Sequence, residues 1–178
     1  MDKKIIRRAN QIIRANRPAY LTYEICSEHY SANSLEIAFL SKRCRNDANG
    51  SCIMCDYGYS QVTHTDEEYL SEMQKILTKY QNLDSVLLCT NGSILDENQV
   101  STDLFEKILK VAAGSNVKEI QIETHYNNIS KTKLELIKSI CSNKVVTIEL
   151  GFETANIAYQ DTLIMKNIKL DEFEKTLN

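Results

Sequence analysis

Four short apolar segments alternate along this chain with segments of helical periodicity, and this alternation limits the fold more than any other feature. The apolar segments cover residues 35–40, 84–89, 117–123 and 145–151. No two of them are joined by a short turn sequence that marks a β-hairpin, so each connection is expected to be a helical crossover. Such crossovers are right-handed in nearly all proteins, which makes the strands parallel and sequential in order. The predicted fold class is α/β, a partial parallel (β/α) barrel with about four βα units.

Helix starts are marked by short capping sequences. Thr65-x-x-Glu68 and Thr132-x-x-Glu135 have the spacing of a capping box, and Ser101 stands before a further helical segment. A last helical piece is expected over residues 170–177. The chain begins with a segment of amphipathic helical pattern, residues 3–16, which Pro18 ends. Its apolar positions are Ile5, Ile6, Ala9, Ile12 and Ile13.

Composition narrows the class of protein. The 178 residues fit a single domain, and the 43% of hydrophobic residues suffice for a core. No apolar run approaches the ~20 residues of a membrane span, and the N-terminus lacks the apolar region of a secretion signal. Six cysteines without a secretion signal favour metal or thiol chemistry in a reducing compartment over disulfides. A cytoplasmic location without membrane association is therefore expected.

Charge is unevenly distributed along the chain. Residues 1–18 carry a balance of +5, which leaves −8 for the remainder of a chain whose net charge is −3. The acidic body argues against broad binding to a phosphate backbone. The basic N-terminal helix could contact RNA. The alternative is an ordinary basic helix face in contact with solvent.

Three cysteines lie on one loop after the first apolar segment. Cys44, Cys52 and Cys55 have the spacing C-x7-C-x2-C, and the loop is rich in turn-forming residues. A closed zinc site or an all-protein iron–sulfur cluster takes four ligands, so three thiolates would leave one iron open to a small molecule. S-adenosylmethionine can chelate such an iron through its amino and carboxylate groups. Zinc bound with a fourth ligand, or plain thiols, remain the alternatives, and the three histidines are scattered.

Further candidate residues follow the other strands. Because parallel strands end at one edge of a sheet, these residues are expected to share a rim with the cysteine loop. Carbonyls beside Gly92 could accept hydrogen bonds from an ammonium group, although Asn91-Gly92 could also be only a turn. Glu123 and Glu153 could bind an ammonium or ribose hydroxyls, or be ordinary rim charges.

At four places the chain resembles the radical SAM superfamily, within it the branch of the elongator catalytic subunit. The places are the loop from Cys44 to Tyr57, Gly92-Ser-Ile-Leu-Asp96, Glu123-Thr124 and the segment Gly151–Asn156. The resemblance implies a 4Fe-4S cluster on Cys44, Cys52 and Cys55 with S-adenosylmethionine on the open iron. It implies no catalytic residue beyond the cluster. It also implies that Thr90, Asn91, Gly92 and Ser93 hold the methionine ammonium, with Glu123 and Glu153 near the methionine or ribose.

The chain departs from this family in three respects. Asp56 replaces a usual glycine, residues 160–167 lack the usual Asn-Lys-Gly run, and about four βα units are present where such domains have six. The expected division is a helix and connection over residues 1–30 and a partial barrel over 31–178 without its last units. The uncovered fourth strand would be an exposed edge.

The function expected from the resemblance is that of a radical SAM enzyme. It would generate a 5′-deoxyadenosyl radical and abstract hydrogen from a tRNA base. The alternatives are a radical SAM enzyme of a small metabolite, a non-catalytic iron–sulfur module and a zinc-binding domain. Expected partners are an electron donor, a tRNA or small-molecule substrate, and a second subunit that completes the barrel.

Overall fold

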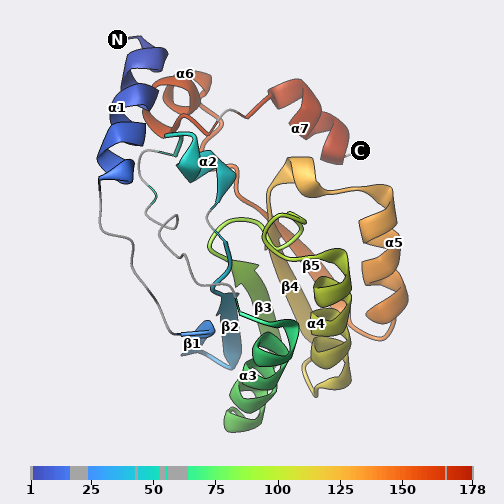
Figure 1. Ribbon diagram of the computed structural model, residues 1–178. Helices are drawn as coiled ribbons and strands as arrows, with labels where there is room; N and C mark the ends of the chain where they lie inside the picture. The colour runs from blue at the N-terminus through green and yellow to red at the C-terminus, as the bar shows by residue number, and fades with distance from the viewer. Residues whose placement is uncertain are drawn as a thin grey trace.

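A five-stranded sheet forms the centre of the protein (Figure 1). The computed structural model describes residues 2–16, 24–42, 44–52, 55, 64–166 and 168–177. Strands β2 (Ser34–Phe39), β3 (Ser85–Thr90), β4 (Glu119–Thr124) and β5 (Val145–Leu150) are parallel and lie in sequential order. The expected α/β class and the order of its parallel strands are confirmed. The partial barrel of the radical SAM type is not confirmed by this sheet.

The sheet begins with a strand that the sequence analysis missed. β1 (Cys26–Ser31) pairs antiparallel with β2, and Ser31 lies opposite Ser34. The two residues between them, Ala32 and Asn33, have φ of 49° and 63°, the left-handed backbone that a tight hairpin turn requires. The connection expected up to residue 30 is therefore in part a strand, which a hairpin joins to the first of the four predicted strands. The turn contains no glycine, so it lacks the strongest sequence signal for a hairpin.

Three helices cover one face of the sheet and enclose the core (Figure 1). They are α3 (Asp66–Lys79), α4 (Thr102–Gly114) and α5 (Lys131–Ile140). The strands alternate, so every second side chain faces these helices. The fully buried side chains on this face of the strands are Leu35, Ile37, Val86, Leu88, Ile120 and Ile122.

The capping prediction for α3 is confirmed, and the one for α5 is wrong. The Thr65 hydroxyl accepts a hydrogen bond from the Glu68 N–H at 3.2 Å, and the Glu68 carboxylate accepts one from the Thr65 N–H. In α5 the N-cap is Ser130, whose hydroxyl accepts from the Lys133 N–H at 3.3 Å. Thr132 lies inside this helix. Both residues have hydroxyls near the helix start, so the spacing of threonine and glutamate does not by itself identify the N-cap.

The N-terminal helix α1 (Lys3–Ala15) packs through its polar side. An amphipathic helix usually buries its apolar face, but Ile5, Ile12 and Ile13 are 64%, 49% and 52% exposed. The Asn10 side-chain amide instead donates to the Gly50 carbonyl at 3.3 Å, and Lys3 pairs with Asp161 at 2.8 Å. The helix thus contacts the segment after β2 and presents an apolar face outward.

The remaining elements are short and lie near the carboxyl ends of the strands (Figure 1). They are α2 (Arg45–Ala48), η1 (Tyr126–Asn128), α6 (Ile157–Tyr159), the π-helical turn η2 (Gln160–Ile164) and α7 (Leu170–Leu177). The expected last helix is confirmed. Its Phe173 ring packs on the rings of Phe152 and Tyr126, with centroids 4.4 and 5.6 Å apart, which fixes α7 above η1. Within the residues that the structure describes, none of the helices has both the length and the apolarity needed to cross a bilayer.

Candidate functional site

Polar side chains join the carboxyl ends of β2 and β3. The Asn91 side-chain oxygen accepts hydrogen bonds from the N–H and hydroxyl of Ser41, at 3.1 and 2.9 Å. Its amide donates to the Ser41 carbonyl at 3.2 Å. Both residues are buried, so water cannot replace these hydrogen bonds. Loss of one partner would leave the other with an unsatisfied buried polar group, which destabilises the fold. Asn91, predicted to bind a cofactor, therefore ties two strand ends together.

The side chain of Gln99 packs directly on Gly92. It accepts from the Ser93 N–H at 2.6 Å and donates to the Lys42 carbonyl at 2.9 Å. A Cβ atom added to Gly92 would collide with the Gln99 side-chain amide. Glycine at position 92 thus leaves room for the Gln99 amide, which a larger residue would displace. The predicted turn residue has a packing role that the sequence did not indicate.

Ser93 connects β3 to β4. Its hydroxyl lies 2.7 Å from the Thr124 hydroxyl and accepts from the Asn128 amide at 2.7 Å and from the His125 N–H at 3.2 Å. The residue is 1% exposed. The hydroxyl of Thr90, also buried, accepts from the Gly92 N–H at 3.1 Å. Thr90 and Ser93 therefore use their hydroxyls within the fold, and their predicted contact with a cofactor stays a prediction.

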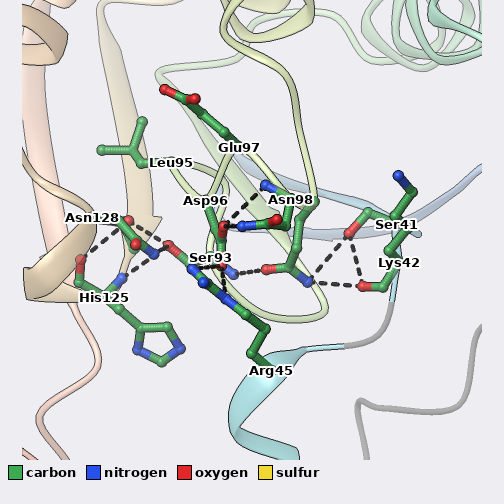
Figure 2. A network of polar contacts seen from close by, with 12 residues as sticks. Ser41, Lys42, Arg45, Ser93, Leu95, Asp96, Glu97, Asn98, His125 and Asn128 are labelled. Carbon is green, nitrogen blue, oxygen red and sulfur yellow. Dashed lines mark hydrogen bonds and ion pairs between the residues drawn. The ribbon is translucent and has the colours of Figure 1, made fainter. Parts of the chain in front are cut away.

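Asp96 anchors the loop after β3 to α2. Its carboxylate accepts from the Asn98 N–H and side-chain amide at 3.0 and 2.8 Å, and from the Arg45 guanidinium at 2.8 and 3.0 Å (Figure 2). Burial alone would raise the pKa of the Asp96 carboxyl, but the hydrogen bonds from Asn98 and then Arg45 outweigh it and lower that pKa. Asp96 is therefore charged at neutral pH and holds Arg45 in place.

A small polar cavity lies beside this ion pair. Its volume is about 230 Å³. α2 and the residues on either side of it form one wall, the loop after β3 forms a second and the segment around η1 forms the third. The lining residues are Cys44, Arg45, Asn46, Asn49, Asp96, Gln99, His125, Asn127 and Asn128.

His125 is the titratable ring in this cavity wall. Burial, followed by the nearby charge of Lys166, lowers the pKa of its imidazole to about 4. The ring is therefore neutral at pH 7 and can both donate and accept a hydrogen bond. Figure 2 shows it on the same side of the loop after β3 as the Arg45 side chain. No sequence pattern pointed to His125, because a lone histidine carries no spacing signal.

Carboxylates gather on the sheet face away from the covering helices. Glu123 lies opposite Glu149 in the paired strands. Burial, followed by the charge of Glu149, raises the pKa of the Glu123 carboxyl, with Lys166 opposing. Lys166 pairs with Glu153 at 2.7 Å, and a Cβ atom on Gly151 would come 2.5 Å from its ammonium nitrogen. Both predicted glutamates thus lie around Lys166, which the sequence analysis did not identify as a functional residue.

The three predicted metal ligands lie within electrostatic reach of one another. Burial raises the pKa of the Cys52 thiol to about 12, and Lys166, Cys55 and Cys44 all act on it electrostatically. Among the described residues, no group of three or more His, Cys, Asp or Glu side chains could hold a metal ion. Tyr57 and Asp56, parts of the predicted loop motif, lie outside the described residues. The ligand assignment stays a prediction, and elemental analysis of the purified chain for iron and zinc is its direct test.

Comparison with known proteins gives two informative relatives. The chain is 28% identical over 145 residues to the archaeosine synthase subunit beta of Methanosarcina acetivorans, a match that covers 79% of this chain and 42% of the relative. It is also 28% identical over 131 residues to the protein of the same name from Thermococcus kodakarensis, with 70% and 40% covered. The chain spans about two fifths of the length of these relatives. No family model matches, and no solved structure matches.

These findings correct the identification made from the sequence. The relatives carry the name of a synthase subunit, not of a radical SAM enzyme, and no described group of side chains is arranged to hold a metal. The prediction that this chain is a radical SAM enzyme that generates a 5′-deoxyadenosyl radical is therefore wrong. Similarity to the synthase subunits takes its place. The 4Fe-4S character is likewise unsupported by the described residues. The chain is similar to archaeosine synthase beta subunits over most of its length.

Proposed function

We propose that this chain acts as one subunit of a tRNA-modifying assembly related to archaeosine synthase. The observation that carries the proposal is the match of 79% of the chain to a protein named as a subunit of that synthase. Archaeosine is a modified nucleoside of tRNA. A subunit name implies a second polypeptide, and we propose that this chain has one as its partner.

The charge of α1 supports contact with RNA. Lys4 and Arg8 are exposed on this helix, while the body of the chain is acidic. Contacts to phosphates account for most non-specific affinity for nucleic acids and weaken as salt is added. A single basic helix on an acidic body would direct RNA to one side of the molecule. That side is also where α1 adjoins the segment that lines the polar cavity.

The proposal is tested by deleting the gene for this chain from its host and analysing the nucleosides of bulk tRNA by mass spectrometry. We expect one modified nucleoside to disappear, its precursor to accumulate, and the wild-type gene to restore it. An unchanged nucleoside profile would contradict the proposal.

A binding measurement tests the RNA contact directly. Lys4→Glu with Arg8→Glu should weaken tRNA binding about tenfold or more at low salt, because two phosphate contacts are lost. Lys110→Glu is the control, since Lys110 lies on α4, away from α1, and pairs with Glu106 of its own helix. Equal affinities for the two variants would remove α1 as an RNA contact.

A further inference from the structure

The polar cavity at the carboxyl edge of the sheet contains hydrogen-bonding groups that the fold does not use. The side-chain amides of Asn46, Asn49 and Asn127 line it, and none of them bonds to another residue in the described part of the chain. By contrast, the amides of Gln99 and Asn128, which also line the cavity, and of Asn91 nearby are all hydrogen-bonded to strand ends or loops. Some amides at this rim therefore stabilise the fold, whereas those of Asn46, Asn49 and Asn127 remain available in the cavity.

The His125 imidazole adds a neutral donor and acceptor to the same cavity. Its backbone N–H donates to the Ser93 hydroxyl at 3.2 Å, so the main chain that carries the ring is held by the buried contact between β3 and β4. The ring itself makes no hydrogen bond to another described residue. It is therefore available to a ligand, and the main chain that carries it is held in place.

Arg45 supplies a flat cationic surface whose charge is already balanced. Its Nε and one terminal nitrogen both donate to a single oxygen of Asp96, which holds the guanidinium in one orientation. The Arg45 side chain is 62% exposed, whereas that of Asp96 is 9% exposed. A guanidinium held in this way favours a stacked heteroaromatic ring over a second anion.

These groups define the chemistry of the occupant. An anion would meet an arginine that Asp96 already neutralises, and an apolar ligand would leave four polar groups unsatisfied. Amide side chains bind the edges of nucleobases through paired donors and acceptors, and a neutral imidazole can do the same. About 230 Å³ is less than the ~300 Å³ at which drug-sized sites begin, so the volume suits one heterocycle.

We propose that this cavity binds one unpaired nucleobase of the RNA. The inference rests on the proposed function, because it names the part of the tRNA that this subunit holds. Asn46, Asn49 and Asn127 would bond to the edge of the base together with His125, and Arg45 would stack on its face. Sequence-specific RNA recognition commonly uses unstacked bases in this way.

The histidines make the test direct, because the chain has only three. We would label the full chain with ¹⁵N-histidine, assign the His125 ring signals with His125→Gln, and titrate in each of the four common ribonucleosides up to millimolar concentration. We expect the His125 ring signals to shift with at least one of them, while those of His29 and His64 stay in place. Unchanged His125 signals with all four nucleosides would overturn the inference.

A matched pair of variants locates the site. Asn127→Ala should weaken nucleoside binding about tenfold, since one hydrogen bond is lost. Asn116→Ala is the control, because Asn116 is an exposed amide that lines a surface hollow at the other edge of the sheet. Equal loss in both variants, or none in Asn127→Ala, would overturn the assignment to this cavity.

Intact tRNA separates this inference from the proposed function. If tRNA binds but nucleosides leave the His125 signals unchanged, the inference fails and the proposed function stands. If nucleosides shift His125 but neither tRNA binding nor the nucleoside profile of the deletion strain depends on the chain, the proposed function fails and the base-binding cavity remains.

Discussion

At the residue scale, the side chains of the rim divide into those that build the fold and those that remain available. Hydrogen bonds that join the strand ends use the polar groups of Ser93, Asn91 and Gln99. Residues that follow the strands were expected from the sequence because parallel strands end at one edge. Which of them are structural could not be predicted, since it depends on partners up to 58 residues away along the chain.

Glu123 gives a prediction about charge. It faces Glu149 across the paired strands, and its raised pKa means that the folded state binds its proton more tightly than the unfolded state does. Stability from this group is therefore present at low pH and is lost as the pH rises from the unfolded pKa through the folded one.

We expect Glu123→Gln to raise the free energy of unfolding at pH 7 by about 0.5 kcal/mol, the size of an opposed like-charge pair. Urea unfolding at pH 7 and at pH 4 measures it, and the gain should shrink at the lower pH. A loss of stability at pH 7 would mean that Glu123 has a favourable partner in solution.

At the scale of elements, the boundaries of the strands and of the last helix followed from hydrophobic patterning. The exceptions are the hairpin of β1 and β2, whose turn is Ala32-Asn33, and the start of α5. The hairpin turn contains no glycine, and two hydroxyl residues stand near the start of α5, so the local sequence pattern does not identify either feature. The outward apolar face of α1 is a third exception, because periodicity indicates an amphipathic helix but not which side is covered.

The cap of α5 yields a paired prediction. Ser130→Ala should lower the free energy of unfolding by about 1 kcal/mol, because the Lys133 N–H loses its acceptor. Thr132→Ala should cost nothing, since Thr132 lies within the helix and alanine has the better helix propensity. Chemical denaturation of both variants checks this. A greater loss in Thr132→Ala would restore the cap expected from the sequence.

At the scale of the whole molecule, α1 and the segment after β2 are held at Gly50. This residue has φ of +72°, and an added Cβ atom would lie 2.5 Å from the Arg7 carbonyl oxygen. Alanine there would meet both backbone strain and a clash with main-chain atoms that cannot rotate away. The contact is therefore sensitive to a single methyl group.

We expect Gly50→Ala to lower the free energy of unfolding by about 1–3 kcal/mol and to increase amide hydrogen exchange in α1. Gly114→Ala is the control, since no tertiary contact from the described residues comes within 4 Å of its added Cβ and it ends a helix at ordinary φ. That variant should be neutral or stabilised by about 0.5 kcal/mol. Unchanged exchange in α1 of Gly50→Ala would show that the helix is held by other contacts.

The outward apolar face of α1 has a thermodynamic consequence. The opposite side of this helix bonds to the carbonyls of Asn49 and Gly50, and Asn49 also lines the polar cavity. Any molecule that covers Ile5, Ile12 and Ile13 and shifts the helix would therefore change the affinity of the cavity for its ligand. Because linkage is reciprocal, a ligand in the cavity would change the affinity of α1 for that molecule by the same factor.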